Sequence, residues 1–217
     1  MVDLRVLFRV EGLLWRIALA VALVSATPTP TAASHSVPGW PFYWDVDNDG
    51  IAEAADSAPT FQKLGNLWSA QKESRLDGAL GTWRNNTDFN PAKAAASVNG
   101  VRIDGAVPYC VGSWSPSTVA LNCVAYTVRG AVWDIHKSTI YLNEFNFNFS
   151  YNDDPPGPGL YDGEGVIAHE LGHAVFLLDL SCAPGPTMCG SSTAAQSFHL
   201  RSLDQDDKDA ANAVYLP

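Results

Sequence analysis

Two histidines and a glutamate form the most chemically suggestive group in this sequence of 217 residues. His169 and His173 are four positions apart, and this spacing on an α-helix places two side chains on one face, about one turn apart. Two imidazoles in that arrangement can bind one zinc ion. Glu170 points about 100° away from His169 around the helix, so its carboxylate is free to exchange protons with a water molecule that attacks a carbonyl. The pattern is typical of zinc-dependent hydrolysis of peptide bonds.

The residues around this group predict a largely apolar helix. Asp162 is a suitable N-cap, and apolar residues then recur at Val166, Ile167, Leu171, Ala174, Val175 and Leu178. A surface helix with two hydrated histidines is the alternative interpretation. The apolar pattern favours burial instead, and buried polar groups need partners. We therefore expect a metal at this group.

A catalytic zinc usually has three protein ligands and one water molecule. No glutamate follows Glu170, which excludes a downstream glutamate as the third ligand. Asp179 lies six residues after His173 and offers carboxylate oxygens that suit zinc. The other candidates are His199 and His136, followed by Asp204, Asp206 and Asp207.

The run from His169 to Asp179 resembles the metzincin signature H-E-x-x-H-x-x-G-x-x-H/D, and its aspartate ending is similar to the snapalysin group of small secreted bacterial proteases. The resemblance implies a zinc endopeptidase with His169, His173 and Asp179 as metal ligands. In that family Glu170 would be the general base and then the general acid. The implied substrate is a peptide or protein.

One position departs from the family pattern. Phe176 stands where metzincins have a glycine that ends the helix in a left-handed conformation. Phenylalanine in that conformation would be strained. We therefore expect either that the helix continues by about a turn or that another residue takes the third site. The departure also supports an alternative function, a non-catalytic calcium-binding cell-surface module on a degenerate metzincin fold.

Two further segments add to the resemblance. Met188, between Pro186 and Gly190, is similar to the Met-turn that lies beneath the metzincin zinc site, although a methionine that fills a core gap is the simpler interpretation. Residues 203–215 resemble the last helix of matrixin-like metzincins. The implied fold is α+β: a mixed twisted sheet with a long helix behind it, the zinc helix, and a small C-terminal subdomain that holds the Met-turn and the final helix.

The chain between residues 60 and 151 predicts the elements of that sheet. Apolar residues from Phe61 to Trp83 recur at steps of three or four, which predicts a helix over 60–83. Residues 98–151 are rich in β-formers, with glycine and asparagine between them. The stretch 138–143 looks like the metzincin edge strand, which pairs with an extended substrate.

Residues 1–34 have the basic, apolar and small-residue order of a secretory signal peptide, or of an N-terminal anchor if the segment is retained. The apolar run is short for a membrane span. We expect the fold to begin near residue 35 and to form one catalytic domain over 35–217, exported and monomeric. The net charge of −10 argues against nucleic acid or an anionic membrane as a partner.

Residues 35–59 are expected to hold an N-terminal strand and then a possible calcium loop. Carboxylates at spacings 1, 3, 5 and 12, with Gly50 at position 6, fit a loop that binds a hard cation through oxygen atoms. An acidic turn without a metal is the alternative. The proposed calcium ligands are Asp45, Asp47, Asp49 and Asp56.

The four cysteines fit an exported protein with two disulfides. The pairs closest in sequence are Cys110 with Cys123 and Cys182 with Cys189, and these are the predicted bridges. A structural zinc site of thiolates is the alternative, but the spacings do not match one.

Overall fold

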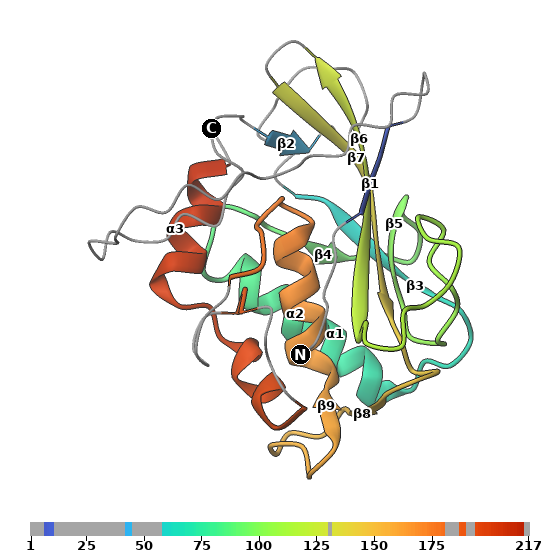
Figure 1. The fold of residues 1–217 in the computed structure, drawn as a ribbon. Coiled ribbons are helices and arrows are strands. Elements are labelled where there is room, and N and C mark those ends of the chain that lie inside the picture. The colour runs from blue at the N-terminus through green and yellow to red at the C-terminus, as the bar shows by residue number, and fades with distance from the viewer. Residues whose placement is uncertain are drawn as a thin grey trace, which may run out of the picture.

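The computed structural model describes residues 7–10, 42–44, 58–129, 132–180, 187–189 and 194–214. These residues form an α+β structure with a mixed, twisted sheet and three α-helices, as expected (Figure 1). The main sheet has the strand order β1-β6-β7-β5-β3-β4, and β2 also pairs with β7. Its strands are β1 (Leu7–Val10), β2 (Phe42–Trp44), β3 (Thr60–Leu64), β4 (Ala92–Lys93), β5 (Asn99–Arg102), β6 (Ala120–Arg129) and β7 (Val132–Leu142). A second, two-stranded sheet pairs β8 (Asn148–Ser150) with β9 (Leu160–Asp162).

The hairpin of β6 and β7 is the antiparallel part of the main sheet, and the other pairings are parallel. This topology corrects two expectations. Residues 138–143 do not form an edge, because β7 lies between β6 on one side and β5 and β2 on the other. Residues 7–10 belong to the sheet, because β1 pairs with the outer edge of β6 over Cys123–Tyr126. Removal of residues 1–34 stays a prediction.

The two faces of β6 meet different parts of the protein. Ala120, Val124 and Tyr126 join the main core beneath the helices. Leu121 and Cys123 point the other way and pack against the loop that precedes β6. The predicted disulfide between Cys110 and Cys123 is present and ties this loop to the strand. Over residues 120–126, β6 is therefore buried on both faces.

The helix expected over 60–83 is shorter than predicted. Residues 60–64 form β3, and α1 begins at Ala70 and ends at Arg84. Gly65 adopts a positive φ of 81°, which turns the chain out of the strand, and the Ser69 side chain then caps α1 by accepting a hydrogen bond from the Lys72 amide. A strand and a helix each bury part of the apolar pattern, which a single periodicity could not separate.

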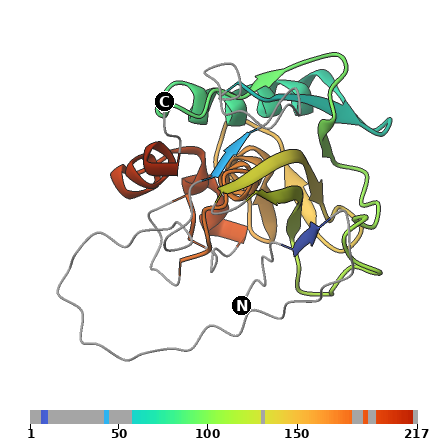
Figure 2. The ribbon, with the colours of Figure 1, turned by 90° about the horizontal axis from the view of Figure 1, so that it is seen from above.

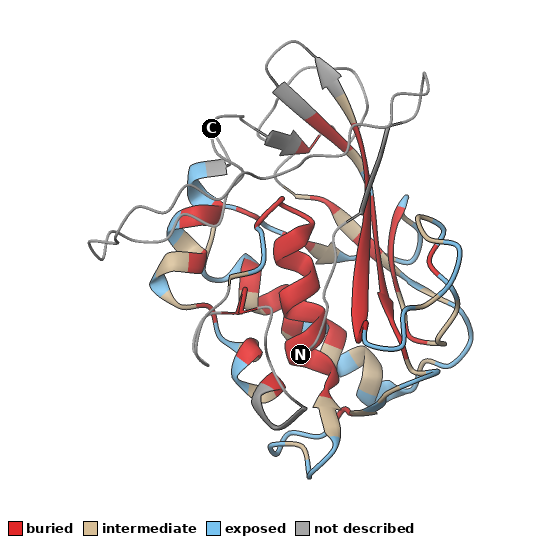
Figure 3. Cartoon of the chain, in the orientation of Figure 1, coloured by how far each residue is buried: buried red, intermediate tan, exposed pale blue. Residues whose placement is uncertain are grey.

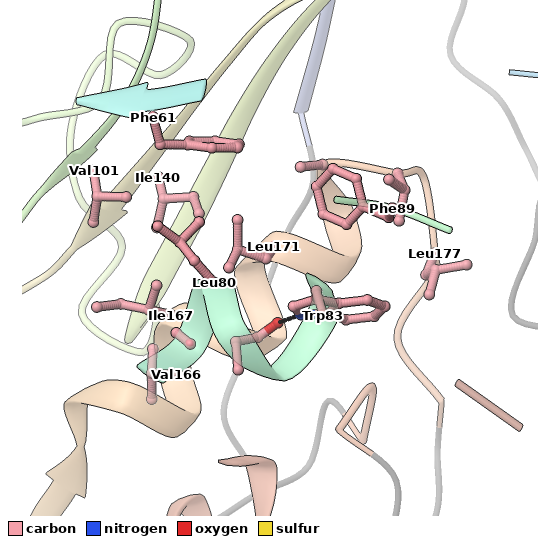
Figure 4. Packing of buried hydrophobic residues seen from close by; sticks show 14 of the residues in the cluster. Phe61, Leu80, Trp83, Phe89, Val101, Ile140, Val166, Ile167, Leu171 and Leu177 are labelled. Atoms are coloured by element: carbon pink, nitrogen blue, oxygen red, sulfur yellow. Dashed lines mark hydrogen bonds between the residues drawn. The ribbon is translucent and has the colours of Figure 1, made fainter. Parts of the chain in front are cut away.

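Helix α1 packs behind the sheet and against α2 (Gly163–His173). Phe61, Val101 and Ile140 from the strands meet Leu80 and Trp83 from α1 (Figure 4). Residues Ile167 and Leu171 of α2 complete this core. The Trp83 indole donates a hydrogen bond of 2.7 Å to the Ala168 carbonyl, so the two helices are joined by a buried polar contact as well.

Every residue of α2 is buried (Figure 3). Asp162 caps its N-terminus as predicted, accepting a 2.7 Å hydrogen bond from the Gly165 amide, and the Arg201 guanidinium donates a 2.8 Å hydrogen bond to the same carboxylate. Arg201 ends the 3₁₀ helix η2 (Ala194–Arg201), and α3 (Gln205–Val214) follows. From above, α2 lies between α3 and the β6–β7 hairpin (Figure 2). None of the described helices is long and apolar enough to cross a membrane.

Candidate metal centre

Three side-chain atoms converge at the C-terminal end of α2. The Nε2 atoms of His169 and His173 are 3.1 Å apart, and the two rings are nearly perpendicular. Oδ1 of Asp179 lies 3.1 Å from Nε2 of His169 and 3.3 Å from Nε2 of His173. Both histidines are fully buried, while 29% of the Asp179 side chain is exposed. The site therefore faces solvent on the Asp179 side.

These distances fit a tetrahedral metal site. Zinc bonds of about 2.0–2.1 Å to nitrogen and oxygen place neighbouring ligand atoms about 3.3 Å apart in a tetrahedron. The three separations of 3.1, 3.1 and 3.3 Å are close to that value. Glu170 also has an oxygen within 4.8 Å of the two histidine ligand atoms. The buried group of His169, Glu170 and His173 could thus hold a metal ion, and Asp179 is placed to join it.

The hydrogen bonds on the far side of each ring fix which nitrogen faces the site. Nδ1 of His169 lies 2.6 Å from the carbonyl of Thr187, and Nδ1 of His173 lies 2.6 Å from the carbonyl of Leu177. A carbonyl only accepts, so each Nδ1 must carry a proton and donate. In the neutral rings, both Nε2 lone pairs then point at each other and at the Asp179 carboxylate. Three electron-rich atoms this close need a cation between them, which is the chemistry of a metal-ligand set.

The pKa shifts in the metal-free site also indicate that the site favours positive charge. Burial alone would lower the pKa of His169, but the hydrogen bond and the charge of Asp179 outweigh it and raise the pKa to about 9. Burial would likewise raise the pKa of Asp179, yet the charges and hydrogen bonds of the two histidines lower it. A metal would replace the protons that these shifts favour.

The Glu170 carboxylate is buried, and neither of its oxygens makes a hydrogen bond of normal geometry with a described residue. Burial raises its pKa to about 7, and the charges of His173 and His169 offset part of the increase. A weak hydrogen-bonding contact with the backbone N–H of Asn122 lowers this pKa as well. A carboxylate whose pKa is close to neutral can both accept and release a proton at physiological pH, as a general base and acid must.

The turn after α2 brings Asp179 to the histidines. The helix ends at His173, and Phe176 adopts the left-handed conformation with φ of 58°. The Leu177 amide donates to the Gly172 carbonyl and the Phe176 amide to the His173 carbonyl, which is the hydrogen-bond pattern of a Schellman motif. The expectation that the helix would continue by a turn is therefore wrong.

Tertiary packing explains why phenylalanine is tolerated at this position. The Phe176 ring is 1% exposed and packs edge-to-face on Tyr126 of β6, with ring centroids 5.5 Å apart. Burial of this ring offsets the backbone strain. The same turn directs the Leu177 carbonyl to the His173 ring, so the turn at Phe176 also orients one of the two histidines.

Met188 lies directly against α2, and its interpretation as a Met-turn stays a prediction. A β-carbon added to Gly172 would meet the Met188 sulfur at 2.2 Å, so glycine at this position lets the methionine approach the helix backbone. The Leu180 amide donates to the Met188 carbonyl at 2.8 Å, which links this turn to the segment that carries Asp179. The neighbouring Thr187 supplies the carbonyl that orients His169.

The sequence did not predict what holds this turn. The buried Asp207 carboxylate in the first turn of α3 accepts hydrogen bonds from the backbone amides of Thr187 (2.8 Å) and Met188 (3.3 Å). Asp207 also accepts from the Asp204 amide, and Asp204 in turn accepts from the Asp207 amide, forming a reciprocal N-terminal cap of α3. Asp207 thus supports the His169 side of the site through the backbone.

The other alternative ligands are also placed elsewhere. His199 is exposed on η2, and Nε2 of His136 lies 2.6 Å from the Thr127 hydroxyl on β6. The Asp206 amide donates to Asp204 at the start of α3. Asp179 is the candidate that the structure places against both histidines.

Several predicted site residues lie outside the described residues. These are the four calcium candidates Asp45, Asp47, Asp49 and Asp56, and Cys182. Cys189, the predicted partner of Cys182, is disulfide-bonded. Calcium binding and the second cysteine pair remain predictions.

No family model matches this chain, and no curated protein matches its sequence.

Proposed function

We propose that this protein is an exported, zinc-dependent endopeptidase of the metzincin type. The observation that carries the proposal is the convergence of Nε2 of His169, Nε2 of His173 and Oδ1 of Asp179 beside the buried carboxylate of Glu170, which has no hydrogen-bond partner of normal geometry among the described residues. The three converging atoms supply the ligands for the ion, and the carboxylate supplies the acid–base group.

The chain's own residues have separate roles in the proposed reaction. His169, His173 and Asp179 would hold zinc, which when bound supplies Lewis acidity toward water and a peptide carbonyl. Glu170 accepts the proton of the attacking water on a carboxylate oxygen and donates it to the nitrogen of the leaving amine. The Thr187 and Leu177 carbonyls keep the two imidazoles in the orientation and tautomer that metal binding requires.

For the substrate we propose an extended peptide that adds as a strand to the outer edge of β6. This strand runs alongside the site: Asn122 donates a hydrogen bond to the Glu170 carbonyl, and Tyr126 packs on Phe176. β1 pairs with β6 over Cys123–Tyr126, so this edge forms main-chain hydrogen bonds with a strand, and a substrate peptide would take the place of β1. Main-chain hydrogen bonds of this kind bind peptides with little dependence on side chains.

Export is supported by the order of residues at the N-terminus and by the disulfide between Cys110 and Cys123, since such bonds persist in oxidising compartments. The alternative function, a non-catalytic calcium-binding module, depended on Phe176. This residue adopts the conformation of the family glycine and Asp179 contacts both histidines, so Phe176 no longer favours the alternative.

The proposal is tested by hydrolysis of unfolded casein with the unmutated protein, with Glu170→Gln, and with Glu73→Gln as a matched control. Glu73 is a partly exposed residue in the first turn of α1, where it forms an ion pair with Lys63. Glu170→Gln should retain zinc and lose about 10²–10⁴-fold in rate, the usual contribution of a general acid–base group. Glu73→Gln should behave as the unmutated protein. Equal rates for Glu170→Gln and the unmutated protein, or no hydrolysis by either, would contradict the proposal.

A further inference from the structure

Asn122 is a fully buried polar residue on a face of β6 that is otherwise apolar. Its neighbours on that face, Ala120 and Val124, belong to the hydrophobic core between the sheet and the helices. A buried amide is costly unless its groups are hydrogen-bonded. A polar side chain at this position therefore indicates a function that an apolar side chain could not perform.

The Asn122 amide joins the sheet to the turn of α2 that carries Glu170. Its Nδ2 donates a 2.8 Å hydrogen bond to the Glu170 backbone carbonyl, and its Oδ1 accepts a 2.8 Å hydrogen bond from the Ser138 hydroxyl on β7. The carbonyl can only accept, so the orientation of the amide group is fixed. The Glu170 carbonyl also accepts from the Ala174 amide at 3.2 Å, within the helix.

The chain of buried hydrogen bonds continues across the sheet. The Ser138 amide donates to Oδ1 of Asn99 on β5 at 2.8 Å, and Nδ2 of Asn99 donates to the Thr60 carbonyl on β3 at 3.0 Å. Four strands are thereby connected to α2 at Glu170. Apolar packing between a helix and a sheet has no direction, whereas each of these bonds fixes a distance and an angle.

This connection is important because no hydrogen bond of normal geometry to a described residue fixes the Glu170 carboxylate. Its weaker contact is with the backbone N–H of Asn122, which lowers its pKa. The position of the carboxylate therefore depends on β6 at Asn122 and on its own backbone, which the Asn122 side chain holds to the same strand. The same strand carries the edge over Cys123–Tyr126 that we propose for substrate.

We infer that Asn122 is a positioning residue, which sets the Glu170 carboxylate relative to the strand that binds the peptide. The inference rests on the proposed function for its catalytic consequence, but the clamp between β6 and α2 can be measured without activity. Loss of the clamp should lower kcat and leave KM and zinc affinity nearly unchanged, because neither the β6 edge nor a metal ligand is altered.

Asn143 offers a matched control. It is also fully buried, its Nδ2 donates to a backbone carbonyl, that of Thr118, at 2.7 Å, and its Oδ1 accepts from the Asn146 amide. These bonds do not involve α2. Leucine replaces asparagine with an apolar side chain of similar shape, and alanine provides a second pair of variants if either leucine variant fails to fold.

The experiment compares Asn122→Leu with Asn143→Leu by hydrogen exchange of the α2 peptides and by steady-state kinetics on a casein peptide. Asn122→Leu should exchange roughly tenfold faster near the Ala174 amide and lose about 10–100-fold in kcat, the usual effect of a residue that orients an active group. Asn143→Leu should change neither. Unchanged exchange or unchanged kcat in Asn122→Leu, or equal losses in Asn143→Leu, would overturn the inference. If the unmutated protein cleaves no peptide, the proposed function fails, and the exchange comparison alone decides the clamp.

Discussion

Replacing Phe176 with glycine should destabilise the protein, although glycine is the residue that this backbone conformation favours. The φ of 58° costs a residue with a side chain about 1–2 kcal/mol, which glycine would recover. The Phe176 ring is 1% exposed and packs on Tyr126, and removal of a buried phenylalanine side chain typically costs about 3–5 kcal/mol. The expected net loss of unfolding free energy is therefore about 1–4 kcal/mol.

Urea unfolding of the unmutated protein, Phe176→Gly and Phe176→Ala measures the two terms separately. Both variants lose the ring, but only alanine keeps the strain, so Phe176→Ala should be less stable than Phe176→Gly by about 1 kcal/mol. This order is the reverse of the usual one, in which the alanine variant is more stable than the glycine variant. A Phe176→Gly variant as stable as the unmutated protein would show that the ring contributes little. A more stable Phe176→Ala variant would refute the strain.

Three further predictions concern pH, the N-terminus and the disulfide. In the metal-free protein the pKa of Glu170 is raised from 4.5 to about 7 and that of His169 from 6.5 to about 9, so both bind protons more tightly when folded. Stability should therefore fall as pH rises from about 4.5 to about 9. A melting temperature that increases over this range, measured without zinc, would contradict these two pKa shifts. Removal of the N-terminal segment that includes Leu7–Val10 should lower KM for a peptide, because β1 pairs with the edge proposed for substrate, and an equal KM for both forms would count against that edge. Replacing Cys110 and Cys123 with serine should cost about 3 kcal/mol in urea unfolding, as expected for a loop of this length, and an unchanged midpoint would show that the bridge constrains little.

The helix of the candidate site was predictable because its signals are local. Asp162 caps α2 as expected, and His169 and His173 lie together because a spacing of four residues determines their relation within one helix. The disulfide between Cys110 and Cys123 was predicted from nearness in sequence and is present.

The supports of the site were not predictable because they come from distant segments. Thr187 orients His169 through its backbone carbonyl, the Asp207 carboxylate accepts from the Thr187 amide, and Asn122 meets Glu170 across 48 positions of sequence. Every residue has a main-chain carbonyl, so residue type does not show which carbonyl will bind a histidine. A buried asparagine in an apolar strand is a weak signal, but it could have marked Asn122 for closer attention.

Two of the fold predictions failed because tertiary contacts overrode a local sequence pattern. The apolar spacing from residue 60 fits a helix, yet Gly65 divides it into β3 and α1. The strand at 138–143 was expected at an edge, but β6 pairs along its outer side, and strand order depends on long-range pairing. Phe176 was judged from backbone preference alone, whereas its packing on Tyr126 offsets the strain.

The most direct test of the central claim is zinc affinity, measured by competition with a chromogenic chelator for the unmutated protein, Asp179→Ala and His199→Ala. The account predicts one zinc per chain, an affinity for Asp179→Ala that is weaker by more than about 100-fold, since even partners outside the ligand set contribute 10–100-fold, and no change for His199→Ala. An unmutated protein that binds no zinc, or an Asp179→Ala variant with unchanged affinity, would contradict it.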